Sequence, residues 1–208
     1  MLNQIYRRRK RITTNGVSNQ FTGQVCQDSS IPCGYGTSIF NPRNSANAKN
    51  YTGYWHNGLF HGLGNFHFLD GAFYNGMYQQ GKFTGYTSKY CFRQDSCIVG
   101  TMDENGPIFG TWTQSDGVYD GYFQNYLPNG LGTMKLTNGC TYSGPFLNGR
   151  YHTSGLLNTG SWTTPSGTTY KGSYQYGTPV GVHQVTYPNG STNQIEATAN
   201  FDGIWNAC

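Results

Sequence analysis

The sequence predicts an all-β fold: an elongated, single-layer antiparallel β-meander of repeated hairpins, twisted into a trough. Three observations support this prediction. Within Tyr51–Phe68, aromatic residues and glycines recur at every second position, as in Tyr51, Gly53 and Trp55, and this period of two is typical of strands. Dipeptides that favour tight turns separate such stretches, and 30 of the 208 residues are glycine. The aromatic–glycine–aromatic pattern that begins at Tyr51 returns 23 residues later at Tyr74, and a fixed period indicates a repeat array.

The first complete hairpin shows how such a sheet could pack without a second layer. Its turn is predicted at Asn57-Gly58, because both residues tolerate positive φ. Later turns are predicted at similar dipeptides, such as Asn129-Gly130 and Asn148-Gly149. Glycine leaves a flat surface on which a neighbouring aromatic ring can lie. We therefore expect rings of adjacent strands to cover the repeat glycines, among them Gly76, Gly121 and Gly172.

The motif Y-x-G-x-W-x-x-G-x-x-H-G-x-G in this hairpin resembles the MORN repeat, short for membrane occupation and recognition nexus. The matching positions are Tyr51, Gly53, Trp55, Gly58, His61, Gly62 and Gly64. Imperfect copies begin at Tyr74, Ile98, Tyr119, Tyr142 and Tyr170. The resemblance implies a non-enzymatic interaction array. Enzymes of this family carry catalysis on a separate domain, for which this chain has no room.

The repeat pattern divides the chain into four predicted segments. They are a basic N-terminal tail (1–20), a degenerate first repeat or N-terminal cap (21–50), the repeat array (51–192) and a C-terminal half-repeat or cap (193–208). Insertions relative to the repeat fall at Tyr86–Cys97, Tyr151–Pro165 and Ser191–Asn200. Insertions in repeat proteins map to loops, so we expect loops in these three places.

Positive charge is concentrated near the N-terminus. Five of the 13 basic residues are Arg7, Arg8, Arg9, Lys10 and Arg11, which leaves eight basic and nine acidic residues elsewhere. A body so close to neutral has no electrostatic footprint for nucleic acid, and we expect no nucleic-acid partner. The basic run is compatible with contact to an acidic membrane surface or with a clamp inside a protein assembly.

Residue patterns for catalysis or metal binding are missing from the sequence. Asp103-Glu104 is an adjacent pair, and adjacent strand residues point to opposite faces, so no carboxylate dyad is expected. The histidines of the first hairpin are interpreted as structural. We expect no cofactor, no metal and no small-molecule substrate.

The six cysteines leave two alternatives open. Cys26 and Cys33, and likewise Cys91 and Cys97, each bracket a turn. The close Cys pairs with His partners that zinc requires are missing. Met1–Ile12 lacks the apolar core of a signal peptide, so free thiols are the expectation, with short-range disulfides as the alternative.

Ten aromatic residues share one strand parity and are the predicted partner-binding face. They are Tyr51, Trp55, Tyr74, Tyr78, Tyr119, Phe123, Tyr142, Phe146, Tyr170 and Tyr174. We expect an open aromatic stripe on the inner face of the trough, because large exposed apolar patches mark interaction sites and Tyr and Trp are common binding hot spots. The alternative is that the rings only shield glycine backbone.

These observations predict a structural protein that docks protein subunits within a large intracellular assembly of cytoskeletal, ciliary or membrane-apposed type, with a virion as the second choice. Two alternatives remain open. One is a peripheral membrane module that binds acidic phospholipids. The other is a targeting subunit of an enzyme carried on another chain.

Overall fold

A computed structural model describes residues 6–14, 17–27, 29–43, 45, 47–154 and 159–197. These residues form 17 strands and no helix, and each strand is antiparallel to the strands with which it pairs. The predicted all-β meander of hairpin repeats is therefore confirmed. In the part of the chain so described, no helix could span a membrane. The chain divides into two units, Met1–Gly106 and Pro107–Cys208.

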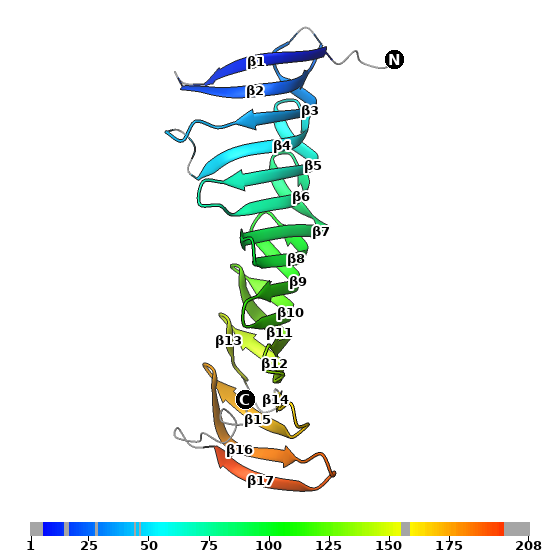
Figure 1. The fold of residues 1–208 in the computed structure, drawn as a ribbon, viewed down its shortest axis with the longest axis vertical. Coiled ribbons are helices and arrows are strands. Elements are labelled where there is room, and N and C mark those ends of the chain that lie inside the picture. The colour runs from blue at the N-terminus through cyan, green and yellow to red at the C-terminus, as the bar shows by residue number, and fades with distance from the viewer. Residues whose placement is uncertain are drawn as a thin grey trace. The chain divides into compact units, whose positions relative to one another are not determined.

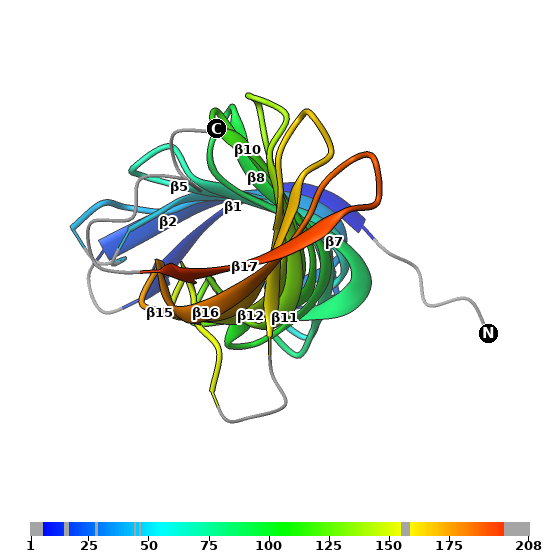
Figure 2. The same cartoon turned by 90° about the horizontal axis from the view of Figure 1, so that it is seen from below.

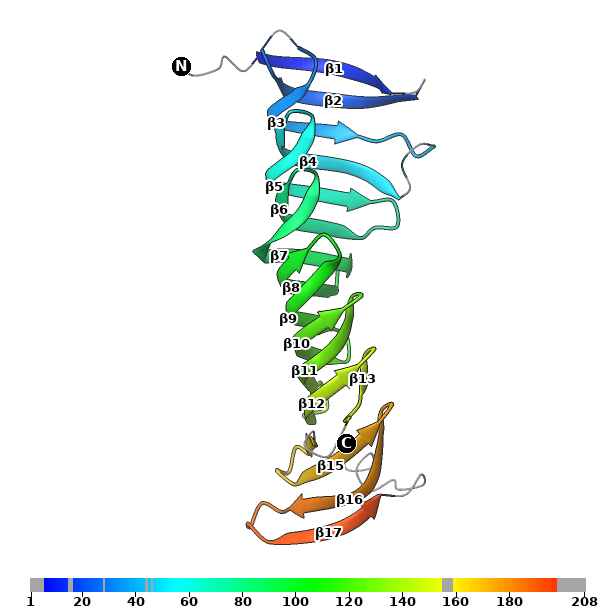
Figure 3. The same cartoon turned by 180° about the vertical axis from the view of Figure 1, so that it is seen from behind.

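Unit 1 contains strands that stack in sequence order (Figure 1; from behind in Figure 3). Each strand pairs with the next along the chain. The strands are β1 (Tyr6–Thr14), β2 (Val17–Val25), β3 (Pro32–Ile39), β4 (Ala48–His56), β5 (Leu59–Phe68), β6 (Phe73–Gln79), β7 (Lys82–Arg93) and β8 (Ser96–Asp103).

Unit 2 follows the same plan, except that two short strands pair with the same neighbouring strand. The strand β12 pairs with both the short β13 and β14. The end-on view shows β11, β12, β15 and β16 overlapping (Figure 2), as expected of strands that stack. The strands are β9 (Gly106–Gln114), β10 (Gly117–Gln124), β11 (Leu127–Leu136), β12 (Thr141–Leu147), β13 (Arg150–Tyr151), β14 (Gly160–Thr163), β15 (Thr169–Gln175), β16 (Thr178–Thr186) and β17 (Thr192–Ala197). The first of them, β9, begins at Gly106, the last residue of unit 1.

Tight two-residue turns close several of the hairpins. Asn57 and Gly58 have φ of 48° and 80°, and Asn148 and Gly149 have φ of 49° and 81°. Positive φ at both positions is the geometry that matches the twist of the flanking strands. The turn predicted at Asn129-Gly130 is wrong, because both residues lie inside β11. Gly130 instead lies where the β10–β11 register shifts, and its φ is 88°.

The sheet begins earlier than the sequence suggested. Tyr6–Thr14, predicted as part of a basic tail, forms β1 and pairs with β2 over its whole length. A run of cations is typical of a solvated segment, yet Lys and Arg are also common on the outermost strand of a sheet, where their charge discourages pairing with other chains.

The three insertions predicted as loops contain strands. Much of Tyr86–Cys97 belongs to β7, a strand of 12 residues. The other two insertions contribute β14 and β17. Counting repeat positions could not reveal this, because an antiparallel strand can lengthen or take a bulge and still keep its pairing.

Candidate functional site

Nine of the ten predicted partner-binding aromatic residues lie in the core. They are at most 8% exposed, and the tenth, Tyr170, is partly exposed. In unit 1 the Tyr51 ring meets Trp55 and Tyr78 edge to face at 5.1 Å. In unit 2 the Tyr142 ring meets Tyr174 in the same way at 5.2 Å. The shared strand parity thus brings the rings together within each unit. The expectation of a stripe open to water is wrong, however, because the rings bury one another. Partner binding by these residues stays a prediction.

Four of the buried tyrosines, each at the start of a repeat, pack on glycine and hydrogen-bond within their own strand. A Cβ added at Gly64 would overlap the Tyr51 ring, and one added at Gly132 would overlap Tyr119. The hydroxyl of Tyr51 donates a hydrogen bond of 2.8 Å to the carbonyl oxygen of Tyr54. Three further repeats make the same bond to the carbonyl three residues on: Tyr74 to Met77, Tyr119 to Tyr122 and Tyr142 to Pro145. Sequence reasoning predicted the glycine contact but missed this hydrogen bond.

The three glycines named in the prediction are all covered, although two are covered differently from the expectation. Gly76 and Gly121 lie under the tyrosine two residues earlier on their own strands, at 2.5 Å from its Oη to an added Cβ in both cases. Gly172 lies under His183 of the adjacent strand. A ring that leans along its strand therefore covers its own glycine and one on the next strand.

Burial keeps the tyrosine hydroxyls protonated. Loss of water around the ring raises the pKa of Tyr51, Tyr119 and Tyr142 well above its usual value, because a phenolate is poorly solvated there. The same effect raises the pKa of Tyr151 to about 12. The hydroxyls of Tyr51, Tyr119 and Tyr142 therefore stay protonated in the neutral pH range and donate the hydrogen bonds described above.

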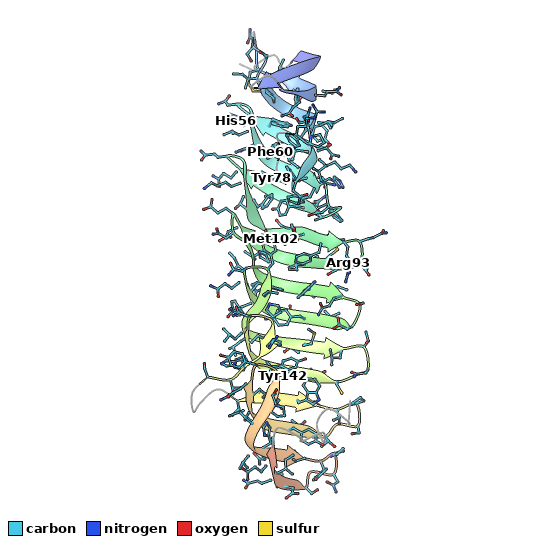
Figure 4. All side chains as sticks on the ribbon, turned by 90° about the vertical axis from the view of Figure 1, so that its left-hand side faces the viewer. His56, Phe60, Tyr78, Arg93, Met102 and Tyr142 are labelled. Carbon is cyan, nitrogen blue, oxygen red and sulfur yellow. A yellow bond between two sulfur atoms is a disulfide. The ribbon has the colours of Figure 1, made fainter. Side chains whose placement is uncertain are left out.

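A second set of aromatic rings covers the buried ones in unit 1. Phe60 stacks on Tyr51 with ring centroids 4.0 Å apart, and Phe83 stacks on Tyr74 at 4.3 Å. Figure 4 shows Phe60 close to Tyr78, and their centroids are 5.6 Å apart. We call this set the inner aromatic layer. Its members, all partly exposed, are Phe40, Phe60, Phe66, Phe68, Phe83 and Tyr90.

Ring contacts make the inner aromatic layer continuous from the end of β3 to β7. Phe40 meets Phe66 at 5.8 Å, Phe66 meets Phe68 at 4.8 Å, and Phe68 meets Tyr90 at 6.1 Å. The sequence contained a signal for this layer: Phe66 and Phe68 alternate with polar residues on the return strand. In unit 2, Pro128 and Met134 lie opposite Phe123 and Tyr119, where unit 1 has Phe60 and Phe66, while Tyr151 covers Tyr142 with ring centroids 4.3 Å apart.

The basic run lies in β1. Backbone pairing places Arg7 opposite Gln24 and Arg11 opposite Gln20. The side chains of these residues lie outside the described part of the structure. A role for the run in binding acidic lipid or in clamping the chain to partners stays a prediction.

Disulfides join the two cysteine pairs whose state the sequence left open. Cys26 bonds to Cys33 and Cys91 to Cys97, with Cα atoms 5.1 and 4.0 Å apart, and Cys140 is disulfide-bonded as well. The expectation of free thiols is therefore wrong. Cys91 and Cys97 face each other directly across β7 and β8, a proximity that only the strand register reveals.

Histidines and acidic residues do not converge on a metal site. Among the described residues, no group of three His, Cys, Asp or Glu side chains could hold a metal ion. His56 and His61 lie 5.5 Å apart between ring centroids at the exposed end of their hairpin. His183 is fully buried over Gly172, and its Nε2 has no hydrogen-bond partner.

A hollow of about 440 Å³ opens on unit 2 beside strands β11 and β12. Leu131, Pro145 and Leu147 line its apolar part, and Asn129 and His152 line its polar part. The backbone N–H of Tyr176 donates to Nδ1 of His152 at 3.3 Å. Such a mixture of apolar and hydrogen-bonding groups suits binding, while a paired acid and base is missing from this lining.

Repeated hairpins with a core of tyrosine on glycine define a β-hairpin repeat protein. Two hairpins, residues 51–73 and 119–141, match the family model for the MORN repeat. The chain therefore contains MORN repeats, as its sequence motif predicted. MORN repeats are non-catalytic modules that generally mediate interaction with proteins or membranes. No functionally curated protein matches the chain.

Proposed function

We propose that this chain is a non-enzymatic interaction protein whose MORN repeats dock partner polypeptides within a larger assembly. The observation that carries the proposal is the inner aromatic layer of unit 1. Five of its partly exposed rings contact one another in sequence, and the sixth, Phe83, stacks on the buried Tyr74. Together they form an apolar surface on a sheet that, in the described residues, has no second layer of its own. Aromatic side chains bury much area at little cost in rotamer entropy, which makes them effective anchors for a partner.

The layer differs from the predicted stripe in the residues that a partner can reach. Tyr51 and Tyr74 lie beneath Phe60 and Phe83, so a partner meets the phenylalanines first. The buried tyrosines act as a rigid base for them. We therefore assign partner contact to Phe60, Phe66 and their neighbours.

The disulfides bear on the location that we propose. Disulfides persist on cell surfaces, on virions and in secretory compartments, and are rare in the cytosol. Of the assemblies expected for this chain, a virion fits two local disulfides better than a cytoskeletal or ciliary complex does. Mass spectrometry tests this point on protein purified from its native source after free thiols have been blocked. If the disulfide is present, Cys91 and Cys97 escape the blocking reagent and their peptides are recovered joined to each other.

The docking proposal is tested by co-purification with quantitative mass spectrometry. We expect the double variant Phe60→Ala with Phe66→Ala to lose the partners of the wild type at least about tenfold, which corresponds to about 1.4 kcal/mol. Thr52→Ala, on the opposite face of β4, is the matched control and should retain them. Circular dichroism should show both variants folded. Equal retention by the double variant and the control would contradict the proposal.

A further inference from the structure

The opposite face of unit 1 carries two parallel rows of side chains that cross β3 to β6. The apolar row consists of Tyr35, Tyr54, Leu63 and Met77, and the polar row consists of Thr37, Thr52, Asn65 and Asn75. On each strand the two members lie two residues apart, so they share one face. We call these eight residues the outer patch of unit 1.

Strand register makes both rows continuous. Tyr35 lies opposite Tyr54, with ring centroids 5.4 Å apart, and Leu63 lies opposite Met77. Tyr54 also lies over Gly62 at the register shift between β4 and β5. In the polar row, Thr37 faces Thr52, Thr52 faces Asn65, and Asn65 faces Asn75.

Unit 2 carries the same arrangement on β9 to β12, which we call the outer patch of unit 2. Its apolar row consists of Phe109, Tyr122, Leu131 and Pro145, and its polar row consists of Thr111, Asp120, Thr133 and Ser143. Phe109 lies opposite Tyr122 with ring centroids 5.0 Å apart, and Leu131 lies opposite Pro145. Tyr122 lies over Gly130 as Tyr54 lies over Gly62.

The apolar rows are open to water, unlike the inner rings. Tyr54 and Tyr122 are 50% and 51% exposed, and Leu63 and Leu131 are 58% and 63% exposed. Tyrosine over glycine explains where the ring sits, but it does not explain why leucine and methionine continue the row in water. In unit 2 the row ends in the hollow of about 440 Å³, which Leu131 and Pro145 line together with Asn129 and His152.

The polar rows offer hydrogen bonds with a single charged side chain among their eight members. The Thr37 and Thr52 hydroxyls lie 3.0 Å apart, as do those of Thr133 and Ser143. In each such pair one hydroxyl proton and several acceptor sites remain for a ligand. The outer patch of unit 1 has no charged side chain, and that of unit 2 has only Asp120.

We propose that the outer patches bind a neutral polysaccharide that lies across the strands. A sugar ring has a C–H face, which packs on aromatic and aliphatic side chains, and a rim of hydroxyls, which pairs with Thr, Ser and Asn groups. Strands spaced about 4.8 Å apart present this combination four times in succession in each unit. Because each patch repeats this combination along its own strands, it suits a ligand that is itself a repeating polymer.

The charge of the patches distinguishes this ligand from other polymers and surfaces. Binding to nucleic acid or to an acidic lipid surface depends on Lys and Arg, and neither patch contains one. The single charged member, Asp120, accepts a hydrogen bond of 2.9 Å from Thr111, and a carboxylate repels anionic ligands. This face therefore differs in chemistry from both the basic run and the inner aromatic layer.

The test uses the full chain in pull-downs with particles of cellulose, chitin and β-1,3-glucan, and in affinity electrophoresis with soluble hydroxyethyl cellulose. Polygalacturonate and phosphatidylserine vesicles are the acidic comparisons. We expect retention by at least one neutral polysaccharide and by neither acidic probe. Tyr54→Ala and Tyr122→Ala should each weaken binding at least about threefold, and the double variant should weaken it about tenfold or more.

Two controls separate this binding from a fold defect and from protein docking. Tyr187→Ala removes an exposed tyrosine outside both patches and should bind as the wild type does. The Phe60→Ala, Phe66→Ala variant should keep polysaccharide binding whether or not it loses protein partners. Three results would overturn the proposal. One is that the wild type binds no neutral polysaccharide, and another is that Tyr187→Ala weakens binding as much as the patch variants do. The third is that Tyr122→Ala abolishes binding to an acidic probe, or self-association, in place of binding to a neutral polysaccharide.

Discussion

The packing of tyrosine on glycine can be tested most directly at Gly132. An added Cβ would lie 2.6 Å from Cζ of Tyr119, about 1 Å less than a normal carbon contact. The ring cannot remain in place, so its hydroxyl would lose the 2.7 Å bond to the carbonyl of Tyr122. Overpacking costs about 1–3 kcal/mol and the hydrogen bond about 1 kcal/mol. We expect Gly132→Ala to lower the unfolding free energy by about 2–4 kcal/mol.

The measurement is a thermal and urea melt of the full chain followed by near-ultraviolet circular dichroism. For a chain of this length the melting temperature should fall by about 4–16 °C. A double-mutant cycle isolates the contact: in a Tyr119→Leu background, Gly132→Ala should cost less than about 1 kcal/mol. An unchanged melt, or an equal cost in both backgrounds, would refute the packing argument.

Three further predictions concern the core, the pH response and the basic run. Gly121→Val should destabilise by about 1–3 kcal/mol, seen as a lower melting temperature, because an added Cβ lies 2.6 Å from the Gly132 Cα. Burial lowers the folded-state pKa of His183 below its ordinary 6.5, so the unfolded chain binds the proton more readily than the folded chain. The contribution of His183 to stability should be complete above pH 6.5 and should fall as pH decreases below it. A His183→Phe variant should lose this part of the pH dependence. If the basic run binds lipid, replacing the charged residues of 7–11 by Gln should abolish salt-sensitive sedimentation with acidic vesicles. If the run is a clamp, the same change should reduce incorporation into the assembly, and vesicle binding should stay at background for both proteins.

The hairpin repeat could be predicted from sequence because its signals are local. The spacing of Tyr51, Gly53 and Trp55 sets the strand, the parity and the face, and Asn57-Gly58 sets the turn. In residues 21–50, predicted as a degenerate repeat or an N-terminal cap, Phe21 lies over Gly36 of β3, which is the same contact of an aromatic ring with glycine.

What sequence could not supply was the number of layers on each face. Strand parity places Tyr51 and Phe66 on one side, but it does not say which ring covers the other. That order depends on how far each ring leans along its strand and on the register across the hairpin. The pairing of Cys91 with Cys97 and the presence of β7 across a predicted loop depend on register in the same way.

A sheet without a second layer must build its core from its own side chains. This requirement gives each face a different role. On the inner face, Tyr51 and Tyr74 are fully buried because glycine lets the rings lie flat and Phe60 and Phe83 close over them. This face therefore holds the core, and only its upper layer can meet a partner. On the outer face, Tyr54 covers Gly62 but stays half exposed. Exposed apolar area on that face contributes little to stability, so its retention in both units points to a ligand.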